Sequence, residues 1–222
     1  VVVNPSGTRV YVANNESNSV SVIDSATNVV VATVAVANSP HGVAINPSGT
    51  RVYVTRGSGG IAFVSVIDTA TNTVVDTINV GGPQTGIAIN ASGTRAYVAV
   101  TGSNTVRVVD LASNASIANV AVGAAPLGIS VNPSGSHVYV ANLVSNDVSV
   151  IATSSNTVVA TVAVGTSPFA FGTFIAAPPG VTPPTFSVRD ADRFGDPAAT
   201  GLAGVSVTLL SGAQVIDTAT SN

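Results

Sequence analysis

The stretch Asn4-Pro-Ser-Gly-Thr-Arg-Val-Tyr-Val-Ala13 decides the fold, because the chain repeats it three more times. The copies begin at Asn46, Asn90 and Asn132, at spacings of 42, 44 and 42 residues. All the tyrosines of the chain occupy one position of this repeat, namely Tyr11, Tyr53, Tyr97 and Tyr139. Self-similarity at this period indicates an array of like structural units.

Each unit divides into four predicted strands, which in the second unit span residues 42–46, 51–55, 64–68 and 73–80. The first two strands are joined by Asn-Pro-Ser-Gly, in which proline restricts φ and glycine accepts positive φ. The last two are joined by a turn headed by Asp, which can hydrogen-bond its own downstream backbone. A proline marks each crossing to the next unit (Pro40, Pro83, Pro126 and Pro168). Four strands in about 42 residues are typical of a β-propeller blade.

The apolar pattern also favours blades over a two-layer sandwich. Residues 29–36, Val-Val-Val-Ala-Thr-Val-Ala-Val, are apolar on both faces, whereas a sandwich strand alternates. Because neighbouring blades cover both faces of a blade, we expect both faces of such strands to be buried. We predict an all-β fold in which residues 1–175 form four four-stranded antiparallel blades, with no helix longer than a turn.

The units resemble the YVTN family of β-propeller repeats, whose motif is seen here as Tyr53-Val54-Thr55 and as Tyr11-Val-Ala-Asn14. The resemblance covers residues 1 to about 175. It implies a closed propeller, often of seven blades, of the kind found in cell-surface and surface-layer proteins. Some relatives resemble lactonases and other propeller enzymes. The four blades are therefore expected to belong to a larger propeller.

Three further segments follow the fourth unit. Residues 168–175 have the pattern of one more first strand, and we expect it to lack a partner within this sequence, so that upstream blades or another chain cover it. Residues 176–184 form a Pro-rich linker. Residues 185–222 resemble the start of the prealbumin-like B-type modules of bacterial adhesins, on an acidic stretch followed by Gly201-Leu-Ala-Gly-Val-Ser-Val-Thr-Leu-Leu210. This resemblance implies a partial β-sandwich domain.

Composition excludes several classes of function. Charged residues make up 8% of the chain, every basic residue is Arg, and the net charge is −3. Nucleic-acid binding needs clustered cations, and no basic stripe exists. The chain has no Cys, which excludes disulfides and thiolate metal sites. The longest apolar run, residues 29–37, is far shorter than the roughly 20 residues of a membrane helix. Low charge with abundant Thr, Ser and Asn favours an extracellular, cell-surface location.

The one dense acidic cluster is formed by Asp190, Asp192 and Asp196. Its Asp-x-Asp alternation resembles a Ca²⁺-binding loop, in which oxygen ligands surround a hard cation. Arg189 and Arg193 interrupt the negative charge, so a solvated acidic loop is the alternative. Calcium at these three residues is the one cofactor that the sequence suggests.

Other polar residues have structural explanations. Asp24, Asp68 and Asp110 share one repeat position, where we expect them to cap turn amides, and the fourth unit has Ala152 there. His41 and His137 occupy unrelated positions, and no nucleophile with a base can be assembled from the sequence. We therefore predict that the chain is not an enzyme. Three N-glycosylation sequons begin at Asn15, Asn90 and Asn114.

Three functions remain in competition. The first is an extracellular structural or adhesive scaffold that mediates protein–protein assembly in a fibre or surface layer, by self-assembly or with upstream blades. In one version, the unpaired strand of one chain completes a blade of the next by strand addition. The second is a carbohydrate- or peptide-binding module, and the least favoured is a lactonase-like propeller enzyme.

Overall fold

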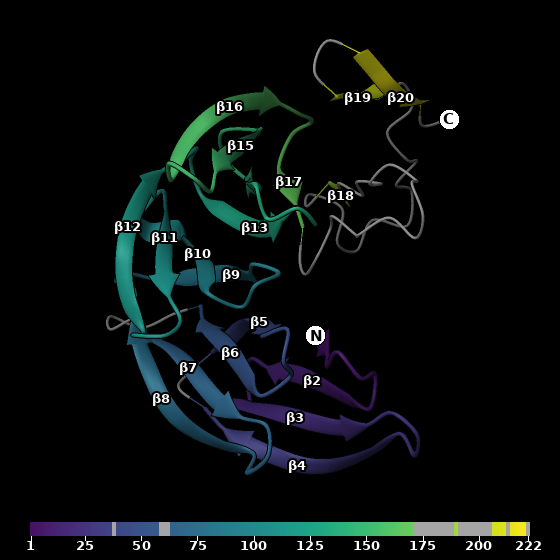
Figure 1. The fold of residues 1–222 in the computed structure, drawn as a ribbon, viewed down its shortest axis with the longest axis vertical. Helices are drawn as coiled ribbons and strands as arrows, with labels where there is room; N and C mark the ends of the chain where they lie inside the picture. The colour runs from purple at the N-terminus through teal and green to yellow at the C-terminus, as the bar shows by residue number, and fades with distance from the viewer. Residues whose placement is uncertain (37–38, 58–62, 171–188, 191–205, 212–213, 221–222) are drawn as a thin grey trace.

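The computed structural model describes residues 1–36, 39–57, 63–170, 189–190, 206–211 and 214–220, and this part of the chain is built of β-strands (Figure 1). Its one helical element is a 3-10 turn, η1 (Thr101–Ser103). None of these residues belongs to a helix with the length and apolarity that crossing a membrane requires. The predicted all-β class is confirmed.

The described residues between 1 and 163 form four antiparallel sheets of four strands, each with the strands in sequence order. The first blade contains β1 (Val2–Val3), β2 (Arg9–Asn14), β3 (Ser19–Asp24) and β4 (Val29–Ala35). The second contains β5 (Pro40–Ile45), β6 (Arg51–Arg56), β7 (Phe63–Asp68) and β8 (Thr73–Asn79). The third contains β9 (Gln84–Ile89), β10 (Arg95–Val100), β11 (Thr105–Asp110) and β12 (Ala115–Ala121). The fourth contains β13 (Pro126–Val131), β14 (His137–Asn142), β15 (Asp147–Ala152) and β16 (Thr157–Ala163).

The four blades follow one another along an arc (Figure 1). Strands β5, β9 and β13 lie on its concave side, and strands β4, β8, β12 and β16 lie on its convex side. The described residues do not close this arc into a ring. The predicted four-bladed repeat is confirmed, and a total of seven blades stays a prediction.

In the described part of the chain the core consists of three apolar clusters, one at each junction between consecutive blades. At the first junction a forward face of blade 1 meets a backward face of blade 2. The forward face consists of Tyr11, Val20, Val22 and Val34. The backward face consists of Val43, Val52, Val54 and Ile67. The same repeat positions form the other two junctions, so burial between blades is the repeating source of stability.

The expectation that the fourth strands are buried on both faces is wrong. In β4, Val29, Val30 and Val31 are 50–56% exposed, because the fourth strand lies at the outer edge of its blade. Pairing with β3 shifts between Val30 and Ala32, which makes Val31 a β-bulge residue. Every blade repeats this bulge, and the bulged residues are 47–55% exposed: Val31, Val75, Ile117 and Val159. The apolar run therefore reflects an interrupted alternation at an edge.

The turns match their predicted chemistry. Gly49 of the first turn of blade 2 has φ +72°, and its N–H donates to the Asn46 carbonyl at 2.9 Å. The equivalent glycines of the other blades also have positive φ, between 69° and 72°. A Cβ added at Gly7 or Gly135 would meet nothing within 4 Å, so conformation rather than space requires glycine there.

Beyond the fourth blade, β17 (Pro168–Phe169) pairs antiparallel with β18 (Arg189–Asp190). The expectation that this strand lacks a partner within the sequence is therefore wrong for these two residues, because residues from the other side of the predicted linker pair with it. β17 also lies against β14, as β13 lies against β10. A separate pair, β19 (Ser206–Ser211) and β20 (Gln214–Thr220), is antiparallel. The adhesin-like domain and the linker boundaries stay predictions.

Candidate functional site

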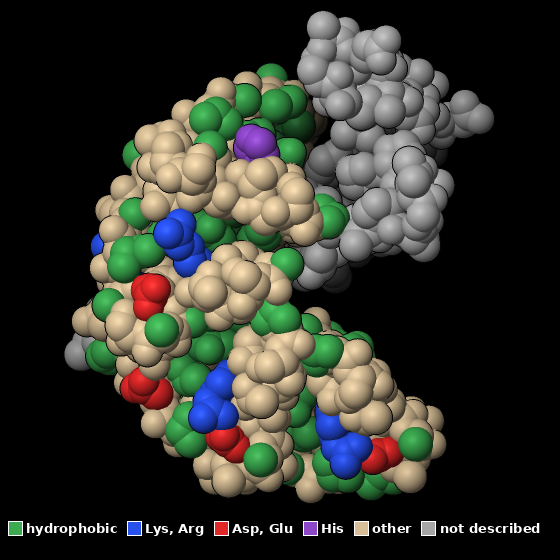
Figure 2. Space-filling model, viewed as in Figure 1, with side chains coloured by type: hydrophobic (Ala, Val, Ile, Leu, Met, Phe, Trp, Pro, Cys, Tyr) green, Lys and Arg blue, Asp and Glu red, His purple; other side chains and the backbone are tan. Residues whose placement is uncertain are grey.

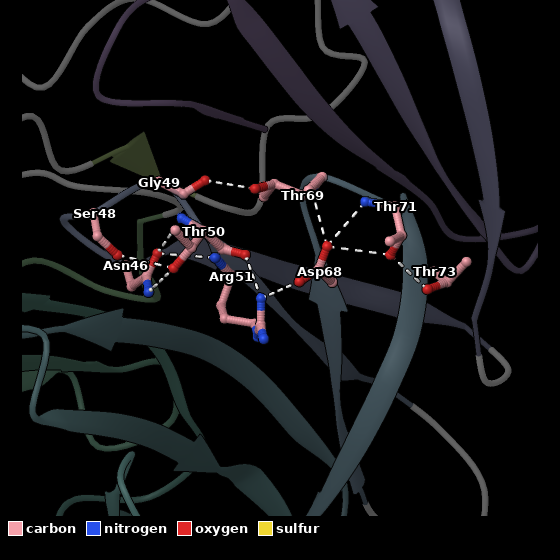
Figure 3. A network of polar contacts seen from close by, with 10 residues as sticks. Asn46, Ser48, Gly49, Thr50, Arg51, Asp68, Thr69, Thr71 and Thr73 are labelled. Atoms are coloured by element: carbon pink, nitrogen blue, oxygen red, sulfur yellow. Dashed lines mark hydrogen bonds and ion pairs between the residues drawn. The ribbon is translucent and has the colours of Figure 1, made fainter.

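The repeated aspartates cap turns, as Figure 3 shows for blade 2. Asp68 Oδ1 accepts the backbone N–H groups of Ala70 and Thr71, both at 2.9 Å, and the Thr71 hydroxyl at 3.1 Å. Its second oxygen accepts a hydrogen bond from the Arg51 guanidinium. The Thr71 N–H in particular holds the pKa of Asp68 below its ordinary value, because it stabilises the ionised carboxylate. The carboxylate is thus engaged in its own turn.

The partner of the arginine at this repeat position differs between blades. Blade 1 repeats it, with Arg9 Nη1 2.5 Å from Asp24 Oδ2. In blade 3 the Arg95 guanidinium donates to the Thr153 carbonyl of blade 4 at 3.1 Å. Asp110 keeps its cap on Ser113 N–H at 2.9 Å. On the face viewed in Figure 2, acidic and basic side chains of the described residues are interspersed and form no patch of one sign.

Asparagines with a left-handed backbone conformation (positive φ) are a second repeated structural feature, which sequence reasoning missed. Asn104 has φ 54°, and its side-chain oxygen accepts the N–H of Ala125, in the crossing to the next blade, at 2.9 Å. In the same way, the side-chain oxygens of Asn18 and Asn146 accept hydrogen bonds from the backbone N–H groups of Ser39 and Ser167, each at 2.8 Å. Four more asparagines have positive φ in the turn before the fourth strand: Asn28, Asn72, Asn114 and Asn156. Asn tolerates this conformation better than most residues, so its recurrence at fixed offsets was an available signal.

The first strands of neighbouring blades approach one another so closely that two of their glycines have no room for a side chain. A Cβ built on Gly86 would lie 2.4 Å from the Leu127 carbonyl oxygen of the next blade, and one on Gly42 would lie 2.3 Å from that of Thr85. The buried Thr55 hydroxyl accepts the Gly42 N–H at 2.7 Å and donates to the Thr85 carbonyl at 2.6 Å. These contacts join blades 2, 3 and 4 on their concave side.

A cavity of about 350 Å³ opens where blade 1 meets blade 2, and Asn15, Pro40, His41 and Val43 are among its lining residues. The Asn15 amide donates to the Pro40 carbonyl at 3.3 Å across this junction. His41 is exposed, yet the atoms packed around its ring lower its pKa by partial desolvation. The volume is within the range of small-molecule sites, and His41 and Asn15 supply its polar groups.

The predicted calcium ligands are placed only in part. Asp190 lies in β18, paired with Pro168 of β17, whereas Asp192 and Asp196 lie outside the described residues. Among the residues that the structure describes, no three His, Cys, Asp or Glu side chains gather as metal ligands. Calcium at Asp190, Asp192 and Asp196 stays a prediction. His41 and His137 lie in different blades, at the start of β5 and of β14.

The sequon asparagines all donate hydrogen bonds through the amide nitrogen that a glycan would occupy. Asn90 Nδ2 donates to Thr94 Oγ1 at 3.0 Å, while its oxygen accepts the N–H groups of Thr94 and Arg95. Asn114 Nδ2 lies 2.5 Å from Asp76 Oδ2. With the Asn15 contact to Pro40, each sequon asparagine has a structural role in its turn or junction.

The two end blades of the described arc leave part of the surface exposed that the internal junctions bury. On blade 1 the backward face consists of Val1, Val10, Val12 and Ile23, of which Val1 is 72% exposed and the others are partly exposed. On blade 4 the forward face consists of Tyr139, Val148, Val150 and Val162, of which Val162 is 49% exposed and Val150 only 8%, and β17 of the same chain lies against β14. These partly exposed apolar positions are candidate binding surfaces of the described residues.

This architecture defines a β-propeller-like repeat fold, and solved structures share it. The chain matches "Kuenenia stuttgartiensis Hydrazine Synthase" with TM-score 0.70 and 26% identity, over 75% of this chain and 49% of that one. A functionally unknown protein from Desulfotomaculum acetoxidans DSM 771 matches with TM-score 0.68 and 21% identity, over 75% of this chain and 56% of that one. The chain thus spans about half the length of either structure. No protein-family model matches it, and no curated protein does.

Proposed function

We propose that this chain is an extracellular structural or adhesive scaffold of the YVTN type, which mediates protein–protein assembly at the cell surface, in a fibre or surface layer. One observation carries the proposal: within the described residues, apolar positions that a neighbouring blade buries elsewhere are exposed on the end blades, with Val1 72% and Val162 49% exposed. Apolar patches of this kind on a soluble protein mark interaction sites. A scaffold that assembles through its blades uses both faces.

The placement of polar groups supports a scaffold over a lactonase-like enzyme. Hydrazine synthase, one of the similar structures, is an enzyme, so the fold alone does not separate the two classes. Catalysis needs an acid, base or nucleophile free to face a substrate. The Asp24, Asp68 and Asp110 carboxylates instead accept the backbone N–H groups of their own turns. The repeated polar residues therefore serve the blades.

Surface location is tested by protease shaving of intact source cells, followed by mass spectrometry. We expect peptides of this chain to be released from intact cells, together with those of known surface proteins and without cytosolic markers. Release only after lysis would contradict the extracellular scaffold. This readout does not depend on how the chain assembles.

The cavity beside His41 supports a second candidate, a carbohydrate- or peptide-binding module. Glycan and peptide arrays test it, because a pocket of about 350 Å³ is large enough for a sugar or a short peptide segment. Binding that is lost in His41→Ala and kept in His137→Ala, which alters the other histidine, would favour this function. Absence of binding on both arrays would remove its support.

The C-terminal segment is proposed to begin an adhesin-like module that binds calcium through Asp190, Asp192 and Asp196. We expect chelation to raise the protease sensitivity of residues 185–222 and to leave the blades intact, because the ion would cross-link its own loop. The triple Asp→Asn variant should show the raised sensitivity without chelator. Identical cleavage with and without chelator would contradict a bound ion.

A further inference from the structure

We propose that β17 and β18 are the first and second strands of a fifth blade, so that residues beyond the predicted linker join the blade array through a shared sheet. β17 (Pro168–Phe169) and β18 (Arg189–Asp190) pair antiparallel (Figure 1). Residues 170–188 connect these two strands, whereas residues 46–50 connect the first two strands of blade 2. The C-terminal segment of the same chain thus occupies the edge that β17 offers.

The crossing that leads to β17 has the structure of a crossing between complete blades. Ser167 has φ 52°, and its backbone N–H donates to the Asn146 side-chain oxygen at 2.8 Å. Between blades 3 and 4, Ala125 has φ 54° and donates in the same way to Asn104 at 2.9 Å. Serine and alanine rarely adopt this left-handed conformation, so its recurrence after blade 4 indicates that the chain turns there toward a further blade.

β17 takes the place of a first strand on the concave side of the arc. A Cβ built on Gly128 of β13 would lie 2.2 Å from the carbonyl oxygen of Ala170, the residue after β17. The equivalent approach between blades 3 and 4 is 2.4 Å, from Gly86 to the Leu127 carbonyl oxygen. The inner strand after blade 4 is therefore seated as closely as the inner strands inside the array.

The register between β17 and β18 is the register of a blade. In blades 2, 3 and 4, the first residue of the first strand is paired with the last residue of the second strand: Pro40 with Arg56, Gln84 with Val100, and Pro126 with Asn142. Pro168 and Asp190 are paired in the same way. Because register decides which residues of a strand face each side of the sheet, β18 continues the arrangement of the second strands.

Burial on the forward face of blade 4 agrees with a new blade that covers its inner part. Val150 of the third strand is 8% exposed, close to the 1% of its counterpart Val22 in blade 1. Val162 of the fourth strand is 49% exposed, whereas its counterpart Val34 is 5% exposed. The outer part of this face is therefore the part left for the contacts of the proposed scaffold.

A shared sheet would fix the direction in which the C-terminal segment leaves the blade array. A Pro-rich linker alone acts as a semi-rigid spacer, whereas paired strands hold two segments in one register. In a surface scaffold, such a joint would keep adjoining modules in a constant orientation. This consequence rests on the proposed function, but the joint itself does not, so its test is independent of surface location.

The first test is a disulfide engineered into the full chain by Phe169→Cys together with Arg189→Cys. Opposite residues of an antiparallel pair have Cα atoms about 4.5–5.5 Å apart, a distance that a disulfide bridges. The chain has no Cys, so no other disulfide can form. Under mild oxidation of the folded protein, we expect nearly all chains to carry this bond within one chain, identified by peptide mass spectrometry. Oxidation in urea should give much less.

The matched control combines Phe169→Cys with Val207→Cys in β19, a strand that pairs with β20. This variant should remain reduced under the same conditions. Equal cross-linking in both variants would overturn the inference, because it would indicate chance encounters. A disulfide between two chains would also overturn it, since a second copy would then supply the strand. So would the absence of any disulfide in a protein that is folded by circular dichroism.

Amide hydrogen exchange tests the same pairing without cysteine. Arg189→Pro removes a backbone N–H group and restricts φ, so it should break the pairing and make the peptide that contains β17 exchange several-fold faster. Arg189→Ala removes the same charge but keeps the N–H group, and it should leave the exchange of β17 unchanged. Equal exchange of β17 in the two variants would contradict the fifth blade.

Discussion

The innermost and outermost strands of a blade have similar apolar sequences and opposite environments. At Gly86 of β9, the position of an added Cβ lies 2.4 Å from the backbone of the next blade. At Val75 of β8 the side chain is 52% exposed. Blades converge on the concave side of the arc and diverge on the convex side, so one interface is tight at one end and open at the other. The loss of folding stability on substitution therefore depends on where in the blade a residue lies rather than on its hydrophobicity.

The largest effect is expected from Gly86→Ala. The new Cβ would meet the Leu127 carbonyl oxygen, a backbone atom that cannot rotate away, so the two blades must separate. We expect the free energy of unfolding to fall by about 3–4 kcal/mol, measured by urea denaturation. Gly135→Ala is the control, with positive φ and open space, and a loss of about 1–2 kcal/mol. Equal losses would show that close approach is not the reason for glycine on the inner strand.

A smaller loss is expected from Thr55→Val. This change keeps the shape of the side chain but removes the hydroxyl that joins Gly42 N–H to the Thr85 carbonyl. The part-buried Gly42 N–H loses this partner, which should lower the free energy of unfolding by about 1–3 kcal/mol. Thr55→Ser retains the hydroxyl and should recover most of the loss. If serine and valine were equally destabilising, packing rather than the hydrogen bond would explain the effect.

The pH dependence concerns the turns between the third and fourth strands. Turn N–H groups lower the pKa of Asp24, Asp68 and Asp110 in the folded state. Their stabilisation is therefore fully present above the unfolded pKa, about 3.9, and is lost as the pH falls through the lower folded pKa. We expect Tm to decline below about pH 4, and less steeply in a variant in which these three turn aspartates are replaced by Asn. Parallel Tm profiles from pH 5 to pH 2 would contradict a capping role for the three carboxylates.

The smallest effect is expected from Val75→Thr at the outer bulge. Its side chain is 52% exposed, so the new hydroxyl stays hydrated and the stability should change by less than about 0.5 kcal/mol. Val66→Thr makes the same change at a residue only 3% exposed, and should cost about 1–3 kcal/mol. Similar costs at both positions would mean that the outer strand is covered in solution.

Much of the fold was predictable because its determinants are local and repeated. The predicted strand 51–55 is observed as β6 (Arg51–Arg56), and the predicted Gly49 turn has the expected positive φ. The hydrogen bond from Ala125 N–H to the Asn104 side chain was missed because Ala125 lies in the crossing to the next blade. The bulge at Val31 was missed because it depends on register with β3. For the candidate sites, sequence reasoning assigned the caps at Asp68 but not the cavity beside His41, which forms between blades.

The sequence by itself determined the repeat, the four strands of each blade and the chemistry of the turns, since each rests on residues a few positions apart. Only the tertiary structure decided which apolar faces are covered. Val12 and Val54 are the same residue at the same repeat position, yet Val54 is 2% exposed and Val12 is partly exposed. Burial is a property of what lies opposite a side chain, and the neighbour of a blade is a whole blade about 42 residues away. The pairing of Phe169 with Arg189 was decided in the same way, by proximity in space.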